Sequence, residues 1–389
     1  MSKDWEVKSL GSLCEVITKG TTPTSIGHKF VDDGVNFLKV ESITLNGSFL
    51  ENKFAYITKD CNNALKRSQL EEGDILFSIA GALGRTAIVT NEILPANTNQ
   101  ALSIIRLKEN ENILKSYIFL ALNSGFALEQ IEKYKGGVAQ QNLSLTQMKS
   151  FQIPLPKIEQ QKQIVAILDK AFEAIDKAKE NLEKNIQNTK ELFQSRLNEI
   201  FSQKGEGWEE STILEVCNNI FAGGDKPEEN FSKEKTDKFT IPIFANAVKD
   251  KGLYGYTNKA RVNESAITIS ARGSGTGHTE IRMESFFPIV RLIVLVPNTE
   301  KMSLIFLKYI IDNLDILRSG SAIPQLTVPM IKEYKVDYPS LKKQNEIIDE
   351  LDSLKQQTKQ LETHYQQKLQ NLEELKKSIL QKAFSGELI

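Results

Sequence analysis

Cysteine is scarce in this sequence: Cys14, Cys61 and Cys217 are the only three, and no two of them form a CxxC pair. This count argues against a disulfide framework and favours a reducing compartment. No apolar run approaches the length that a membrane-spanning helix needs. The N-terminal residues MSKDWEVK also lack the features of a secretory signal. We therefore expect a cytoplasmic protein without a membrane partner.

An excess of one charge is missing as well, because the net charge is only −1. Any DNA binding must therefore depend on local patches or on a partner. The histidines His28, His278 and His364 have no neighbours at metal-ligand spacing, and no Gly-Lys-Ser/Thr phosphate loop occurs. The glycine-rich loop 273–277 precedes a strand-like segment, which disfavours a nucleotide site. We expect no catalytic residue and no metal.

The sequence does contain a long stretch that occurs twice. Residues 156–201 and 339–384 align without a gap, 183 positions apart. A repeat of fixed period has to be explained before other features. The matched pairs include Pro156 and Pro339, Gln161 and Gln344, Ile164 and Ile347, Leu168 and Leu351, Leu192 and Leu375, Ser195 and Ser378, and Phe201 and Phe384.

Both copies are typical of long coiled-coil helices. They lack internal Pro and Gly, are rich in helix-forming residues, and place residues at alternating steps of four and three. A helix of about 45 residues is roughly 68 Å long, so it cannot hide its apolar stripe in a small domain. Pairing of the two helices is the natural solution. The predicted contact positions are Val165, Leu168, Phe172, Ile175, Lys179, Leu182, Ile186, Thr189 and Phe193, with Ile347, Leu351, Leu354, Thr358, Leu361, Tyr365, Lys368, Leu372, Leu375 and Ile379.

The segments before each helix repeat too. Trp5 to Ile17 align with Trp208 to Ile220, 203 positions apart. Short β-rich runs follow in both segments, and a helix is predicted over 115–132 in the first and 303–317 in the second. The sequence therefore predicts four parts, which are residues 1–153, 154–204, 205–338 and 339–389, in the order domain, helix, domain, helix.

The connection between the helices predicts their direction. The second domain must join Phe201 to Pro339, and domain termini usually lie close together. An antiparallel pair needs only a short bridge. We expect an α+β fold, with two globular α/β domains separated by two long antiparallel helices and related by a pseudo-two-fold internal repeat. The domains share a plan while their loops differ, which suits one frame with two recognition surfaces. Such a frame fits a target with two half-sites.

Several segments resemble the specificity (S) subunits of type I restriction-modification systems, the HsdS family. The resemblance lies in PKIEQQKQIV at 156–165, in LKKSILQKAFSGEL at 375–388, and in residues 5–17 with Lys19-Gly20-Thr21-Thr22-Pro23. It covers nearly the whole chain. The second copy departs from the pattern, with Lys342-Lys343-Gln344 after its proline and Ala222-Gly223-Gly224-Asp225-Lys226-Pro227 in place of Gly-Thr-Thr-Pro.

The resemblance implies a function and a set of partners. Two target recognition domains would read a bipartite target in double-stranded DNA, and the helices would dock two modification (M) subunits. Two restriction (R) subunits would add cleavage. The chain itself would be non-catalytic, with S-adenosylmethionine, ATP and Mg on the partners. It lacks the Asn-Pro-Pro-aromatic run with which similar adenine methyltransferases hold a flipped base.

The candidate DNA-binding residues follow from the chemistry of base edges. Arg and Lys suit guanine, while Asn and Gln suit adenine. The candidates are Lys19, Thr21, Thr22, Arg85, Thr86, Asn97, Asn99, Gln100, Lys135, Gln140, Gln141 and Asn142 in the first domain, and Arg272, Ser274, Thr276, His278, Arg282, Arg318, Ser321 and Gln325 in the second. Each of them could equally be an ordinary solvated loop residue, and residues 97–100 could be a turn that satisfies its own backbone.

Two other functions remain open from the residues alone. A coiled-coil scaffold with two protein-binding domains would share the same repeat and would show no preference for a DNA sequence. A freestanding enzyme that uses the loop 273–277 would lose turnover when Gly275 is substituted.

Overall fold

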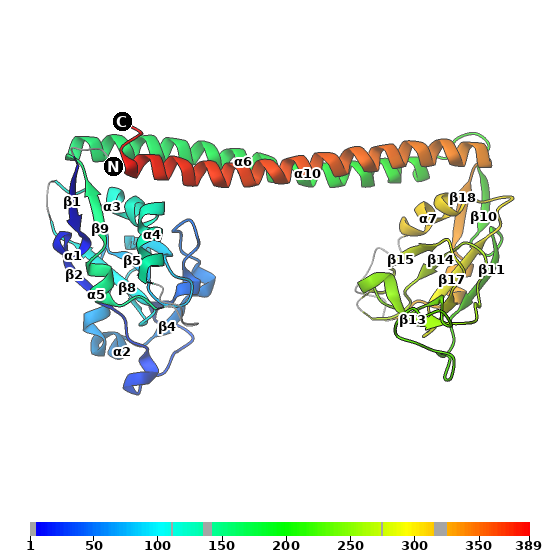
Figure 1. Ribbon diagram of the computed structural model, residues 1–389, viewed down its shortest axis with the longest axis horizontal. Coiled ribbons are helices and arrows are strands. Elements are labelled where there is room, and N and C mark those ends of the chain that lie inside the picture. The colour runs from blue at the N-terminus through cyan, green and yellow to red at the C-terminus, as the bar shows by residue number, and fades with distance from the viewer. Residues whose placement is uncertain (1–4, 110–111, 135–141, 274, 315–324) are drawn as a thin grey trace. The chain divides into compact units, whose positions relative to one another are not determined.

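The computed structural model describes residues 5–109, 112–134, 142–273, 275–314 and 325–389 (Figure 1). The chain divides into two compact units: unit 1 comprises residues 1–182 and 367–389, and unit 2 comprises residues 183–366. Each unit therefore holds one globular segment together with part of each long helix. None of the described helices is long and apolar enough to cross a membrane.

The described residues of unit 1 form three small sheets. Its strands are β1 (Glu6–Ser9), β2 (Cys14–Lys19), β3 (Val35–Leu38), β4 (Ala55–Ile57), β5 (Ile75–Ser78), β6 (Thr86–Ile88), β7 (Ala96–Thr98), β8 (Leu102–Leu107) and β9 (Gln152–Leu155). The sheet orders are β2-β8-β5-β6, β4-β3-β7 and β1-β9. All four residues of β5 are buried between its antiparallel neighbours β8 and β6, so this strand forms the centre of the unit.

The helices of unit 1 differ in one respect from the prediction. They are α1 (Leu10–Leu13), α2 (Lys59–Ala64), α3 (Lys115–Leu122), α4 (Gly125–Tyr134) and α5 (Leu145–Lys149). The single helix predicted over 115–132 is wrong, because the chain breaks between α3 and α4. There the side-chain amide of Asn123 donates to the Phe119 carbonyl, and the hydroxyl of Ser124 donates to the Ala121 carbonyl. Gly125 follows. Polar side chains that bond to nearby backbone in this way compete with helix continuation.

Unit 2 repeats the plan of unit 1. Its elements are β10 (Glu209–Thr212), β11 (Cys217–Ala222), β12 (Ile241–Phe244), β13 (Leu253–Thr257), β14 (Ala266–Ile269), β15 (Thr279–Arg282), β16 (Phe287–Pro288), β17 (Ile293–Pro297), α7 (Leu304–Asp312), α9 (Val328–Lys332) and β18 (Lys335–Tyr338). The sheet orders are β11-β17-β14-β15, β13-β12-β16 and β10-β18, which match those of unit 1 strand for strand. The predicted internal repeat is confirmed.

The long helices are α6 (Ile158–Ser202) and α10 (Leu341–Ser385), and each has 45 residues. In unit 1 the start of α6 shares a core with the end of α10, since Leu168 and Phe384 belong to one buried cluster. In unit 2 the end of α6 meets the start of α10 through Leu197 and Leu351. The helices therefore pack antiparallel within each unit, as predicted, and the ribbons can be followed in Figure 1.

The predicted contact seam of α10 is wrong at three positions, Leu361, Lys368 and Leu375, which are all exposed. Leu361 and Leu375 are 41% and 46% exposed, although the heptad pattern placed them inside. Near Leu375 the half-buried Lys376 occupies the contact side instead. Its ammonium lies 4.7 Å from the centre of the Phe172 ring and 3.4 Å from the Asp176 carboxylate. The long aliphatic stem of lysine can cover an apolar neighbour while its charged end reaches a partner.

Two buried cysteines occupy equivalent positions in the repeat. Cys14 and Cys217 open β2 and β11, and burial raises the pKa of each thiol from 9.0 to about 12. Since the folded pKa lies above the unfolded one, the stabilisation by the neutral thiols is complete below pH 9 and is lost between about pH 9 and pH 12.

We predict that neither Cys14 nor Cys217 reacts with iodoacetamide at pH 8 in the folded chain, because the thiolate is the reactive form. Both should react once the chain is unfolded in guanidinium. Mass spectrometry of the alkylated peptides measures this difference, and rapid labelling of the folded chain would contradict it.

Candidate nucleic-acid interface

The turn after β2 in unit 1 lies against the β7–β8 connection. A Cβ added to Gly20 would lie 1.9 Å from the carbonyl oxygen of Thr98, so only glycine allows this approach. The backbone N–H of Thr21 donates to the same carbonyl at 3.2 Å. The hydroxyl of Thr22 donates to Oε1 of Gln100, 78 residues away in sequence. Three of the predicted residues are thus brought together on one surface.

Two cations border this turn. Lys19 is exposed at the end of β2. Arg67 is exposed in the short helix η4 (Lys66–Ser68), and its Nη2 donates to the hydroxyl of Thr21 at 3.5 Å. Sequence reasoning missed Arg67 because nothing near it signals that a chain segment 46 residues away would lie beside it.

A groove of about 400 Å³ lies next to Arg85 and Asn99. Nη1 of Arg85 donates to the carbonyls of Ile43 at 2.9 Å and Val40 at 3.4 Å, while its Nε is buried without a partner among the described residues. Oδ1 of Asn99 accepts from the N–H of Ala101 at 3.1 Å, so this residue does satisfy its own turn. Part of each side chain is therefore used within the fold. The groove is lined by Val40, Glu41, Ala80, Gly81, Ala82, Arg85, Asn99 and Ala101.

The prediction that Thr86 and Asn97 contact DNA is corrected, because both side chains are buried. Thr86 is 2% exposed and its hydroxyl donates to Oδ1 of Asn123 at 2.5 Å. Asn97 is fully buried, and its Nδ2 donates to Oδ1 of Asn62 at 2.8 Å. Buried polar groups of this kind are held by their internal partners. We therefore leave these two residues out of the candidate surface.

In unit 2 two of the predicted residues pair directly. Nη2 of Arg272 donates to Oε1 of Gln325 at 2.9 Å, and the two residues also form an isolated β-bridge. The hydroxyl of Thr276 donates to the carbonyl of Gly273 at 2.7 Å, which shapes the glycine-rich loop. Arg272 is exposed, so the pair lies at the surface of the unit.

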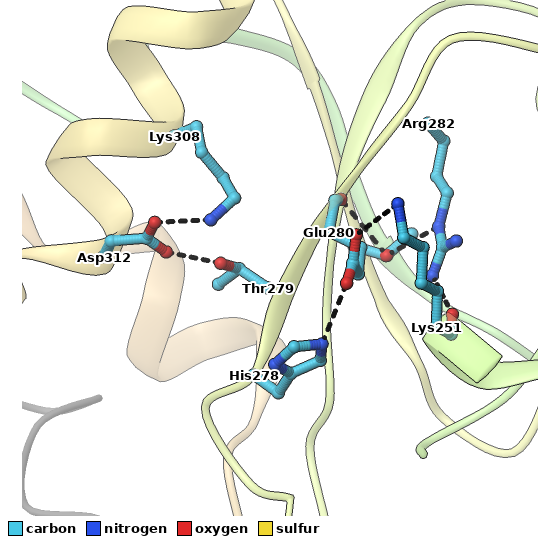
Figure 2. Close-up of polar contacts among 8 residues, drawn as sticks. Lys251, His278, Thr279, Glu280, Arg282, Lys308 and Asp312 are labelled. Carbon is cyan, nitrogen blue, oxygen red and sulfur yellow. Dashed lines mark hydrogen bonds and ion pairs between the residues drawn. The ribbon is translucent and has the colours of Figure 1, made fainter. Parts of the chain in front are cut away.

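Strand β15 carries a small network of mixed charge (Figure 2). Oε1 of Glu280 lies 3.1 Å from Nε2 of His278, and Oε2 of Glu280 lies 4.0 Å from Nζ of Lys251. On the same strand the hydroxyl of Thr279 donates to Oδ1 of Asp312, which ties β15 to α7. His278 is about one-third exposed and remains in the candidate set.

The prediction that Arg282 contacts DNA is also corrected, because only 6% of this residue is exposed. Its Nη2 donates to the carbonyl of Lys251 at 2.6 Å (Figure 2). Its Nε donates to the hydroxyl of Thr268 at 3.1 Å. The guanidinium also lies 3.6 Å from the centre of the Phe244 ring. Burial lowers the pKa of Arg282 to about 10, against the opposing effect of Glu280. These internal partners hold the Arg282 side chain within the fold of unit 2.

Sequence reasoning missed a basic, aromatic region beside this arginine. Nζ of Lys233 lies 4.0 Å from the ring centre of Tyr254 and 5.6 Å from that of Phe231. Lys233, Lys235 and Lys238 between Phe231 and Phe239 were a weak signal, since nucleic-acid surfaces combine cations with aromatic rings but Glu234 and Asp237 lie among these lysines. A groove of about 580 Å³ lies nearby, lined by Lys235, Thr240, Pro242, Phe244, Asp250, Lys251, Leu253, Tyr256, Ile281, Arg282, Met283 and Glu284.

The remaining candidates fall into two groups. Asn142 is exposed just before α5. The others lie outside the described residues: Lys135, Gln140, Gln141, Ser274, Arg318 and Ser321. Across the described ranges, no three His, Cys, Asp or Glu side chains gather closely enough to hold a metal ion.

The fold defines a class of protein: a chain with two globular domains of one plan, each built onto antiparallel long helices. The family of type I restriction modification DNA specificity domains matches residues 2–188 and 205–371, which include most of the chain. The protein therefore belongs to the family of type I restriction-modification specificity subunits.

The chain is also similar in sequence to individual specificity subunits. The putative type I restriction enzyme MjaX specificity subunit of Methanocaldococcus jannaschii is 27% identical over 405 residues, which span 95% of this chain and 92% of the relative. The EcoprrI specificity subunit of Escherichia coli is 24% identical over 354 residues, which span 87% and 85%. A putative specificity subunit of Mycoplasma pneumoniae is 34% identical over 202 residues, about half of either chain.

Solved structures share the fold. A chain from a study of "complex assembly and conformational transition of the type I R-M system" aligns with a TM-score of 0.79 at 21% identity, covering 100% of this chain and 99% of that one. The HsdS subunit from Thermoanaerobacter tengcongensis aligns with a TM-score of 0.67 at 20% identity, covering 100% and 98%. At these identities the likeness concerns the fold alone.

Proposed function

We propose that this chain is the subunit that chooses the DNA sequence in a type I restriction-modification complex, and that each unit reads one half of a bipartite target. The observation that carries the proposal is the matching order of strands in the two units beside their different surface residues. Unit 1 presents Lys19, Arg67 and Gln100, whereas unit 2 presents Arg272 and Gln325. Different polar side chains on one frame suit two unlike half-sites.

The long helices are proposed to dock two modification subunits at equivalent faces. Among the exposed residues that recur at the same places in the two copies of the helix, five lie close together on one side of each helix. Packing within the chain does not account for keeping exposed residues in both copies, whereas the same partner bound twice does. The faces consist of Gln187, Asn188, Glu191, Leu192 and Ser195 on α6, and Gln370, Asn371, Glu374, Leu375 and Ser378 on α10.

The chemistry is proposed to reside on those partners. The family resemblance assigns adenine methylation to the modification subunits with S-adenosylmethionine, and cleavage to two restriction subunits with ATP and Mg. This chain would contribute only the choice of sequence, in the cytoplasm where the DNA lies. Enzymes that modify a base inside a duplex rotate it out of the stack, so the reader must place the partner over one adenine in each half-site.

An exchange of one recognition domain tests the proposal. Residues 1–153 are replaced by the corresponding segment of another specificity subunit, and the chain is produced together with its modification subunit. Methylated adenines are then mapped by sequencing. We expect one half of the methylated sequence to change completely while the other half stays the same, because each unit reads its own half-site.

The reciprocal exchange of residues 205–338 is the matched control and should change only the other half. A methylated sequence that both exchanges leave unaltered would sink the proposal. If no methylation occurs and the chain binds mixed DNA without preference, a scaffold with two protein-binding domains becomes the better explanation.

A further inference from the structure

A buried glutamine joins the start of α6 to the globular part of unit 1. Gln161 is fully buried. Its Nε2 donates to the carbonyls of Asn112 at 2.9 Å and Pro156 at 2.8 Å, and its Oε1 accepts from the N–H of Leu114 at 3.0 Å. Leu114 immediately precedes α3. The amide thus uses both donors and its acceptor to connect the long helix to the backbone that enters α3.

The same arrangement occurs in unit 2. Gln344 is fully buried at the start of α10. Its Nε2 donates to the carbonyls of Lys301 and Pro339, both at 2.8 Å, and its Oε1 accepts from the N–H of Ser303 at 2.8 Å. Ser303 immediately precedes α7, the counterpart of α3. The two glutamines make equivalent sets of hydrogen bonds to equivalent backbone positions.

The surroundings of these glutamines differ in sequence while the contact stays the same. Unit 1 offers Asn112 and Leu114 as partners where unit 2 offers Lys301 and Ser303. The other contacts between each long helix and its globular part include apolar packing, for example Leu168 in unit 1. In unit 2 the hydroxyl of Tyr309 also donates to Asp352 of α10, but the glutamine contact is the one that both units share. Apolar burial is non-directional, whereas hydrogen bonds have a preferred geometry. The glutamine therefore supplies a directional contact, equivalent in both units, between the globular part and its long helix.

We propose that Gln161 and Gln344 are a matched pair of positioning residues that set the spacer between the two half-sites. This inference rests on the proposed function. If each glutamine holds its recognition domain at one angle on its helix, the chain accepts only one separation of the half-sites. One additional base pair moves a half-site by about 3.4 Å along the DNA and also rotates it, so a rigid reader rejects it.

The test replaces each glutamine by methionine, which has a similar length and cannot donate a hydrogen bond. Gln163→Met is the matched control, because Gln163 is exposed two residues further along α6. The variants are produced with the modification subunit, and methylation is mapped on targets whose spacer is native or one base pair longer or shorter. We expect the ratio of shifted to native methylation to rise about tenfold in Gln161→Met and Gln344→Met, which corresponds to about 1.4 kcal/mol.

The bases read in each half-site should stay the same in both variants. A purely structural role predicts a uniform fall in methylation at the native spacer with no shifted sites, and this result would overturn the inference. Unchanged methylation in all three variants would overturn it too. Gln161→Asn, which keeps the amide but is one methylene shorter, supplies a milder variant and should give a smaller rise in shifted sites.

Hydrogen exchange separates this inference from the proposed function. Peptides that contain the amides of Leu114 and Ser303 should exchange about tenfold faster in the corresponding methionine variant, since each amide loses its acceptor. Absence of sequence-specific methylation by the native chain would reject the proposed function and the spacer role together. Unchanged exchange in a chain that does methylate specific sites would reject the glutamine contact alone.

Discussion

A chain that carries both Leu192→Glu and Leu375→Glu is expected to fold normally, to lose both modification subunits and to direct no methylation. Each leucine is largely exposed, at 52% and 46%, so the replacement costs little within the chain. In a docked complex the same leucine would be buried. Losing that burial and placing an unpaired carboxylate in the interface should weaken each face at least about a hundredfold.

The single variants make the expectation sharper. Since Leu192 lies in unit 2 and Leu375 in unit 1, each single replacement should remove one partner and leave the other bound. Native mass spectrometry of the complex measures this stoichiometry directly. A double variant that still binds two partners would contradict the docking faces, whatever its methylation activity.

Two other exposed apolar residues on the same helices serve as controls. Ile167 is 40% exposed, and its counterpart in the second copy is Glu350. Leu361 is 41% exposed, and its counterpart in the first copy is Ala178. Neither residue recurs in the repeat, so Ile167→Glu and Leu361→Glu should leave partner binding intact. If these controls lose partners as readily as Leu192→Glu does, the added negative charge on the helices, and not a specific docking face, explains the loss.

The sequence predicted the repeat, the antiparallel pairing and the sheet-rich units, because these depend on patterns that extend over many residues. It misplaced Leu375 because adjacent residues, Leu375 and Lys376, both fit a seam at this point. An α-helix has about 3.6 residues per turn and drifts against a strict heptad. The neighbouring Phe172 and Asp176 decide the matter by holding Lys376. That information lies on the other helix.

The candidate interface was harder to predict for a related reason. Asn97 and Arg282 have the right chemistry for reading bases, yet both are buried. Asn97 is held by Asn62 and Arg282 by Phe244, partners that lie tens of residues away in sequence. A polar residue in a loop looks alike in sequence whether it reaches solvent or an internal acceptor. Conversely, Arg67 gains its place beside Thr21 only through the fold.

Gly20→Ala is expected to destabilise unit 1 by about 3 kcal/mol or more, because overpacking against rigid backbone cannot be relieved by a rotamer change. The added Cβ would lie 1.9 Å from the Thr98 oxygen and 2.5 Å from the Asn99 oxygen. The alanine must therefore push the end of β2 away from the β7–β8 connection. The pair of Thr22 and Gln100 would separate as well. If unit 1 reads one half-site as proposed, that half-site should no longer be recognised.

The equivalent glycine in unit 2 gives a graded comparison. Gly223 follows β11 as Gly20 follows β2, and its added Cβ would lie 2.6 Å from the carbonyl carbon of Pro288. This overlap is shallower, so Gly223→Ala should destabilise unit 2 less than Gly20→Ala destabilises unit 1. At Gly125, the first residue of α4, an added Cβ meets nothing within 4 Å. Gly125→Ala should therefore be neutral or stabilise by about 0.5–1 kcal/mol.

Urea denaturation followed by circular dichroism and by hydrogen exchange of the β2 and β11 peptides measures the order of the three glycine variants. The Gly20→Ala chain should unfold at the lowest urea concentration and should lose exchange protection in the β2 peptide. The Gly223→Ala chain should lose exchange protection in the β11 peptide. The Gly125→Ala chain should match the native chain. An equal stability of Gly20→Ala and Gly125→Ala would show that β2 does not approach Thr98 as closely as the fold requires. The predicted surface formed by Lys19, Thr22 and Gln100 would then lose its structural basis.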